Sequence, residues 1–130
     1  MIEYLSVEQL LRLHELQVRR FGGSEGLRDR AALEAAAARP AATFGGEDLY
    51  PDVAAKAAAV MHSLVANHPF VDGNKRVGAH ALILTLLVNG HEPAFAAEEL
   101  VEATLAVARG ELQAEALAIW VRQRSRPLEP

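Results

Sequence analysis

The sequence predicts an all-α fold, a compact bundle of about six helices around a buried central helix, with one short flap-like loop or hairpin. Three observations predict it. Apolar residues recur at helical spacing in six segments. Glycine, proline and small polar residues separate these segments, where helices start and stop. The 130 residues suit one domain that buries roughly two thirds of its unfolded surface. We expect this domain over residues 1–126 and a frayed tail at 127–130.

The first helix is predicted from Val7 to about Arg20, where apolar residues follow helical spacing. Ser6 precedes this helix and Gln9 lies in its first turn, which is the spacing of a capping box. Gly22 supplies the left-handed residue that ends it. The N-terminal segment therefore has a start signal, an amphipathic body and a stop signal.

The second helix is predicted over Ala31–Arg39, an alanine-rich stretch with high helix propensity. Asp29 can cap its start and Pro40 ends it. Its small side chains favour close helix packing. For Arg28, just before this helix, structural ion pairing and contact with a ligand or partner both stay open, because arginine is rarely buried unpaired.

The helical pattern breaks over Ala41–Pro51, which contains Gly45 and Gly46. Its length exceeds that of an ordinary helix connection, and long loops in compact domains are often functional. A docking role and a plain connection both stay open. Tyr50 is the residue to test, because an exposed aromatic ring can anchor an extended peptide, although most tyrosines simply pack.

The third and fourth helices are predicted on either side of residues 68–76. Val53–Val65 has one apolar face and follows the helix-starting pair Pro51 and Asp52. Val77–Asn89 is apolar on nearly every side, which is typical of a helix buried all round. We therefore expect Val77–Asn89 to be the central helix of the bundle.

The C-terminal third is predicted to hold two more helices, over Ala97–Arg109 and Glu111–Arg124. His91–Phe95 reads as a short extended connection ahead of them. From Ser125 onward the chain becomes polar, and we expect it to fray. These helices complete the predicted bundle.

The stretch His68–Arg76 concentrates chemical groups at one helix junction. Lys75 and Arg76 stand where a helix starts, and the partial positive charge there disfavours each cation by about 0.3–1 kcal/mol unless an anion is bound. Gly73 lets the backbone approach a ligand, and the amides that follow can converge on phosphate oxygens. The junction therefore predicts an anion site.

Asp72 and His68 indicate which chemistry accompanies the anion. Beside a polyphosphate, a carboxylate is suited to holding Mg²⁺, which prefers one or two carboxylates plus phosphate oxygens. An imidazole has a pKa range suited to accepting a proton from an incoming hydroxyl. Either residue alone would more often be an ordinary loop residue. Together they indicate phosphoryl or nucleotidyl transfer.

The nonamer from His68 to Arg76 resembles the signature of the Fic/Doc superfamily, and every fixed position of that signature is matched. Lys75 stands where AMP-transferring members usually carry glycine, and Ala79 replaces their second arginine. Both differences point to the Doc branch. Arg20–Asp29 and Ala35–Pro40 also look like Doc features, although these matches are weaker.

The resemblance implies a toxin that transfers the γ-phosphate of ATP to a threonine or serine of a translation factor, elongation factor Tu, and thereby inhibits translation. It implies His68 as base, Asp72 on Mg²⁺, Lys75 and Arg76 on the transferred group, and Gly73, Asn74, Lys75 and Arg76 around ATP. It also implies that Ala41–Pro51 is a flap that aligns the target, and that a Phd-like antitoxin covers an apolar groove or the site. An AMP transferase and a catalytically silent antitoxin-binding corepressor remain alternatives.

Composition limits the remaining classes. The formal net charge is −4, so no general basic surface favours direct nucleic-acid binding. The chain has no cysteine, which excludes disulfides and suits a reducing compartment. Its first residues lack a secretory pattern, and its longest apolar run is far shorter than the roughly 20 residues that span a bilayer. We expect a cytoplasmic protein without a membrane contact.

Overall fold

The structure is a computed structural model that describes residues 1–128. In chain order its elements are α1 (Val7–Phe21), α2 (Arg30–Ala38), the 3-10 turn η1 (Arg39–Ala41), β1 (Thr43–Phe44), β2 (Glu47–Asp48), α3 (Val53–Asn67), α4 (Asn74–Val88), β3 (His91–Pro93), α5 (Ala97–Ala108), α6 (Ala114–Gln123) and β4 (Ser125–Pro127). Each of the six predicted helices is present. The all-α prediction is confirmed.

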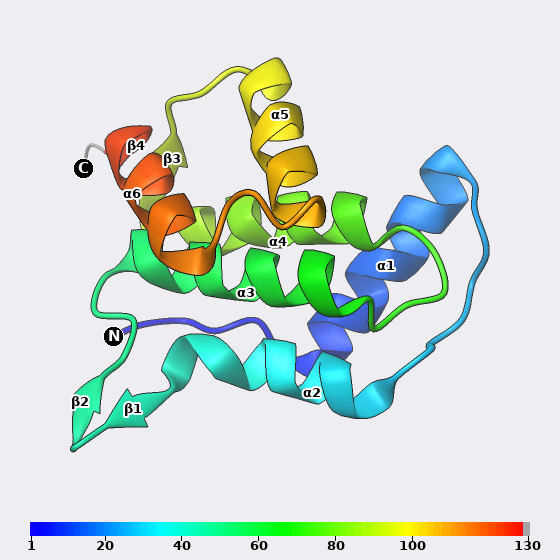
Figure 1. Ribbon diagram of the computed structural model, residues 1–130, viewed down its shortest axis with the longest axis horizontal. Coiled ribbons are helices and arrows are strands. Elements are labelled where there is room, and N and C mark those ends of the chain that lie inside the picture. Colours follow the sequence, from blue (N-terminus) through cyan, green and yellow to red (C-terminus); the bar gives the residue numbers. More distant parts are fainter. Residues whose placement is uncertain (129–130) are drawn as a thin grey trace.

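The helix at the centre of the bundle is α3, not the predicted Val77–Asn89. Figure 1 shows α3 beside α4, with α2 along one flank and α5 and α6 on the other, while α1 crosses at one end. Every residue of α3 from Val53 to Val65 is buried except His62. On α4, Leu87 and Val88 are 43% and 47% exposed. The prediction was wrong because leucines on an outer face look the same in sequence as leucines in a core.

The helix ends follow the predicted signals. The Ser6 hydroxyl and the Gln9 side chain form a reciprocal capping box at the start of α1, and Gly22 ends that helix with φ +82°. Asp29 and Asp52 cap α2 and α3 through their side chains. Each side-chain cap contributes about 1 kcal/mol to helix stability.

The predicted loop at 41–51 contains the hairpin of β1 and β2, in which Thr43 pairs with Asp48. Its turn is Gly45–Gly46, both with positive φ. The buried ammonium of Lys56 on α3 holds the hairpin base, 3.3 Å from Asp48 Oδ2. Tyr50 is half-buried against the core, and its hydroxyl accepts a hydrogen bond from Arg39. Tyr50 is therefore a packing residue and offers no exposed anchor.

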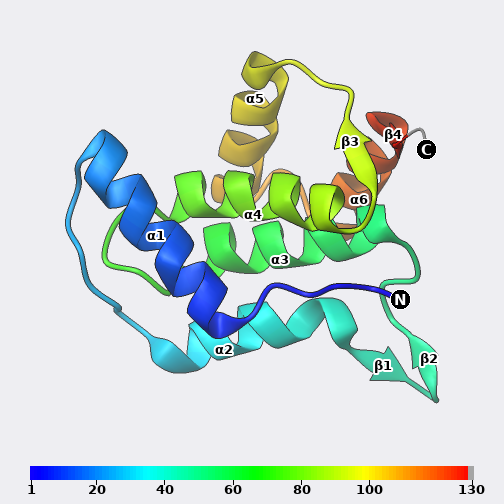
Figure 2. The ribbon, with the colours of Figure 1, turned by 180° about the vertical axis from the view of Figure 1, so that it is seen from behind.

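The hairpin lies at the opposite end of α3 from residues 68–76. Figures 1 and 2 show β1 and β2 at one end of the molecule, and the loop that joins α3 to α4 at the other. The fifteen residues of α3 separate them, a length of about 22 Å. The expectation that Ala41–Pro51 holds a target beside the site is therefore wrong for this arrangement. The exposed ring of this hairpin belongs to Phe44, which is 82% exposed.

The C-terminal segment pairs with the chain after α4 instead of fraying. β3 and β4 are antiparallel, with His91 opposite Pro127 and Glu92 opposite Arg126. The amide of Leu128 donates to the carbonyl of Gly90. The predicted tail at 127–130 is thus ordered through Leu128, while residues 129–130 lie outside the described residues. Among residues 1–128, none of the helices combines the length and apolar character that a bilayer crossing requires.

Gly78 sets the close approach of α4 to α3. A Cβ at this position would stand 2.5 Å from Val65 Cγ2 and 3.4 Å from the Met61 carbonyl oxygen. We expect Gly78→Ala to lower the free energy of unfolding by about 1 kcal/mol, because overpacking costs more than the gain in helix propensity. Denaturant unfolding measures this change. The loss should shrink when Val65→Ala is already present, and strict additivity of the two changes would contradict the steric explanation.

Candidate active site

The six predicted site residues line one open cavity of about 420 Å³ at the loop between α3 and α4. The lining residues are His68, Val71, Asp72, Gly73, Asn74, Lys75 and Arg76. The structure therefore brings together the six positions that were predicted to form the site. The site is built by one turn of chain, which ends one buried helix and starts the next.

The cavity contains the start of α4, which begins at Asn74, three residues before the predicted start. Gly73 is the N-cap with φ +81°, and no side chain caps the helix. The first N–H groups of a helix have no partner within it, and they give this end a partial positive charge. Lys75 and Arg76 lie in this first turn and are exposed. Amides and two cations at one point are the arrangement that binds phosphate.

The side chain of Asn74 is committed to the loop. Its Oδ1 accepts the amide of Phe70 at 3.0 Å, and its Nδ2 donates to the carbonyl of the same residue at 2.9 Å. Asn74 is buried, and Phe70 is 1% exposed. These two contacts hold the loop, and they leave the second Nδ2 hydrogen and the backbone amide of Asn74 for a ligand. The expected place of Asn74 around ATP stays a prediction.

Two backbone amides hold the carboxylate of Asp72 at the cavity. Oδ1 accepts the amide of Gly73 at 2.9 Å, and Oδ2 accepts the amide of Ser24 at 3.2 Å. In the described part of the chain, no group of three or more His, Cys, Asp or Glu side chains could form a metal cage. One exposed carboxylate beside the uncapped start of α4 is compatible with Mg²⁺, which can keep most of its ligands as water and phosphate.

His68 ends α3 in the left-handed conformation, with φ 47° and ψ 61°. Among residues 1–128 it is the one non-glycine residue with positive φ, and such a conformation costs roughly 1–3 kcal/mol. Arg28 stabilises it by donating Nε to the His68 carbonyl at 2.6 Å and Nη2 to the Asn67 carbonyl at 2.7 Å. Arg28 therefore contacts main-chain oxygens in place of the expected carboxylate or ligand.

The segment before α2 lies along the motif. The amides of Arg28 and Asp29 both donate to the Pro69 carbonyl, and the amide of Val71 donates to the Gly26 carbonyl. An isolated antiparallel bridge joins Leu27 to Phe70. The Arg20–Asp29 stretch, which resembled the family only weakly in sequence, thus fixes the path of the motif loop. Its contribution is to position the backbone.

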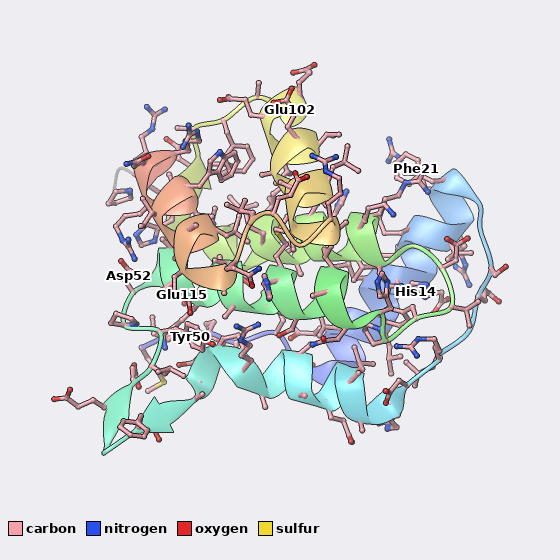
Figure 3. All side chains as sticks on the ribbon, in the orientation of Figure 1. His14, Phe21, Tyr50, Asp52, Glu102 and Glu115 are labelled. Atoms are coloured by element: carbon pink, nitrogen blue, oxygen red, sulfur yellow. The ribbon has the colours of Figure 1, made fainter. Side chains whose placement is uncertain are left out.

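Sequence reasoning gave no functional weight to His14 on α1. The structure buries it, and Nε2 lies 2.8 Å from the carbonyl oxygen of Asp72. Its ring stacks on Phe70 with centroids 3.9 Å apart and planes 3° apart. Figure 3 shows His14 beside the loop that joins α3 to α4. The available signal was a titratable residue at an apolar position of the helical pattern.

A second, apolar cavity of about 570 Å³ adjoins the first and shares Lys75 and Arg76 with it. Side chains of α4, β3 and α5 form most of this groove, and Phe21 at the end of α1 closes one side. Arg76 stacks over the Phe21 ring at 4.7 Å. Partial burial, and then the charge of Arg20, lower the pKa of His80 at the groove. The groove is therefore apolar with a cationic end.

His62 on α3 does not line the motif cavity. Arg39 lies 3.1 Å from its Nδ1 and donates to Ser63. Burial and then the charge of Arg39 lower the pKa of His62, while Glu115 acts in the opposite direction. This network steadies the base of the hairpin and contributes nothing to the motif cavity.

Comparison with known proteins agrees with the motif. The profile of the Fic/DOC family matches residues 4–86. The chain belongs to the Fic/DOC family. Its matched part covers α1 to α4, the helices that build and support the motif cavity. The resemblance expected from the nonamer is confirmed.

Two relatives of this Fic/DOC chain are informative. It is 46% identical over 90 residues to Toxin Doc of Mycolicibacterium smegmatis, across 69% of this chain and 67% of that protein. It is 30% identical over 122 residues to Protein kinase doc of Escherichia phage P1, across 94% of this chain and 95% of that protein. The second similarity extends past the family profile into α5, which lines the apolar groove, and into α6.

Proposed function

We propose that this chain is a Doc-like protein kinase and the toxin of a type II toxin-antitoxin system. It transfers the γ-phosphate of ATP to a threonine or serine hydroxyl of a translation factor, with elongation factor Tu as the expected target. The observation that carries the proposal is the motif cavity, where a base, a carboxylate and two cations meet at an uncapped helix start. The similarity to a protein kinase over nearly the whole chain supports it.

In this proposal the phosphates of ATP lie over the start of α4. The backbone amides of Asn74, Lys75 and Arg76 donate to phosphate oxygens, because the helix provides them no acceptor. The ammonium and guanidinium neutralise charge that develops on the transferred group. Phosphoryl transfer depends chiefly on positioning and charge stabilisation, which this rigid helix start provides.

Asp72 is the residue that would hold Mg²⁺. Its two amide contacts fix the carboxylate and leave lone pairs free on both oxygens. When bound, Mg²⁺ supplies charge neutralisation between phosphate oxygens. Within one cavity, the carboxylate would therefore bind the metal, while the two cations would neutralise the charge on the transferred group.

His68 is the proposed general base. His68 lines the cavity and is exposed, so an incoming protein segment can reach it. It accepts the proton from the attacking hydroxyl while the bond between that oxygen and the γ-phosphorus forms and the bond to the leaving ADP breaks. Arg28 holds the left-handed backbone at His68 and thereby fixes the position from which the imidazole extends.

The position of the label in ATP distinguishes the proposal from its alternatives. With γ-labelled ATP the target becomes labelled, and with α-labelled ATP it stays unlabelled. The reverse result would identify an AMP transferase, in which ATP binds end for end. Absence of both labels on elongation factor Tu and on a translation extract would favour a catalytically silent antitoxin-binding module.

We further propose that the apolar groove receives a segment of the cognate, Phd-like antitoxin. The groove has exposed apolar side chains, of which Val101 is 56% and Leu105 is 38% exposed. Lys75 and Arg76 at one end provide pairing groups for acidic residues. A segment lying there would reach the motif cavity, because both cavities share these cations. This contact explains inhibition from outside the chain.

A charge in the groove tests this contact. We expect Val101→Glu to weaken antitoxin binding at least about tenfold, since it places a carboxylate in an apolar groove. Ile119→Glu is the matched control, because Ile119 is 52% exposed on α6 and lies outside the groove. Titration calorimetry with the antitoxin measures both. Equal affinities for the two variants would place the antitoxin elsewhere.

A further inference from the structure

The contact between His14 and the motif is directional. A backbone carbonyl only accepts hydrogen bonds, so Nε2 of His14 carries the proton that it donates to the Asp72 carbonyl at 2.8 Å. His14 is 5% exposed. Stacking on Phe70 explains why position 14 carries a flat ring, but any aromatic side chain could stack there. It does not explain why this ring carries an N–H donor.

The peptide bond whose carbonyl accepts from His14 could readily undergo a peptide flip, in which its C=O and N–H groups exchange directions. It joins Asp72 to Gly73, whose φ of +81° shows the freedom that glycine has and other residues lack. In a trans peptide the C=O and N–H groups point in opposite directions. With the carbonyl facing His14, the Gly73 amide faces the other way and donates to Asp72 Oδ1 at 2.9 Å.

A turned-over peptide would damage the site in two ways. The Asp72 carboxylate would lose the Gly73 amide that holds one of its oxygens. A carbonyl oxygen would then replace an N–H group on the side of the cavity, where its partial negative charge would repel both the carboxylate and a phosphate. Within the motif, the side-chain contact that opposes this flip is the one that Asp72 Oδ1 accepts from the Gly73 amide, while the Asn74 side chain is engaged with Phe70.

We propose that His14 is a positioning residue of the transfer site: by donating to the Asp72 carbonyl it fixes the Asp72–Gly73 peptide and, through the Gly73 amide, the carboxylate of Asp72. This inference rests on the proposed function for its catalytic consequence. Its structural part, the orientation of one peptide, is independent of the reaction.

Two variants separate the donor from the ring. His14→Phe keeps a ring to stack on Phe70 and removes the N–H. His14→Gln places an amide N–H near the position of Nε2 and removes the ring. We expect His14→Phe to lower turnover about 10- to 100-fold at limiting Mg²⁺, as loss of a group that orients a ligand does, and His14→Gln to recover most of it. Val121→Ala controls for general destabilisation, because Val121 is a buried residue of α6 that does not line the motif cavity.

The readouts are the Mg²⁺ dependence of phosphate transfer, Mg-ATP binding by calorimetry, and the ¹H–¹⁵N signal of the Gly73 amide. In His14→Phe the Gly73 signal should move, Mg-ATP should bind more weakly, and His14→Gln should reverse both changes. The proposal would be overturned if the Gly73 signal and Mg-ATP binding in His14→Phe were the same as in the wild type. It would also be overturned if the Phe and Gln variants lost Mg-ATP affinity equally. If the wild type transfers no phosphate, the proposed function fails, while the Gly73 signal and Mg-ATP binding still decide the role of His14.

Discussion

His68→Asn should lower the rate of phosphate transfer by about 10²–10⁴-fold, because it removes the proposed general base. Asparagine is the suitable replacement, since it tolerates the left-handed backbone that His68 adopts at φ 47°. Loss of activity in this variant therefore reports the missing imidazole and not a collapsed loop. Single-turnover transfer from labelled ATP measures the rate.

Nucleotide binding gives the contrast in the same variant. The phosphates are assigned to the start of α4, so His68→Asn should bind Mg-ATP within about twofold of the wild type, as expected when only a transition-state interaction is lost. His91→Asn is the matched control, because His91 lies on β3 outside the motif cavity. Retained transfer in His68→Asn together with lost ATP binding would reverse the roles assigned here.

Asp72→Asn should have the second largest effect. The amide keeps the size of the carboxylate and can still accept from the Gly73 N–H, but it removes the charge that we propose to hold Mg²⁺. We expect transfer at millimolar Mg²⁺ to fall about 10- to 100-fold or more, and the concentration of Mg²⁺ for half-maximal rate to rise. Initial rates over a Mg²⁺ series measure both.

A surface carboxylate provides the control for this change. Glu102 is exposed on α5 (Figure 3), and it does not line the motif cavity. Glu102→Gln should leave the Mg²⁺ dependence unchanged. If Asp72→Asn showed the wild-type Mg²⁺ dependence, the metal would have to be held by phosphate and water alone.

The sequence predicted the elements of the fold because its local signals are strong. The caps at Ser6, Asp29 and Asp52 and the stop at Gly22 act within a few residues, and the structure has each of them. Local signals do not reveal how many neighbours a helix has. For this reason an apolar α4 was taken for the centre, although alanine-rich α3 has helices around it.

For the candidate site, too, the sequence predicted what is local and missed what is distant. The six predicted site residues, which are close together in sequence, line one cavity. The contributions from distant segments were missed. Arg28 and His14 reach the motif across 40 and 58 positions of the chain, and no spacing rule predicts such contacts. The contacts of the Asn74 side chain with the backbone of Phe70 were missed as well, because they depend on how the loop folds.

The most direct test of the proposed kinase activity is the intact mass of elongation factor Tu after incubation with this protein and Mg-ATP, with His68→Asn in parallel. The proposal predicts a gain of one phosphate group that the variant does not produce. A gain of one AMP group would contradict kinase activity and indicate nucleotidyl transfer by the same cavity. An unchanged mass would contradict the assignment of elongation factor Tu as the target.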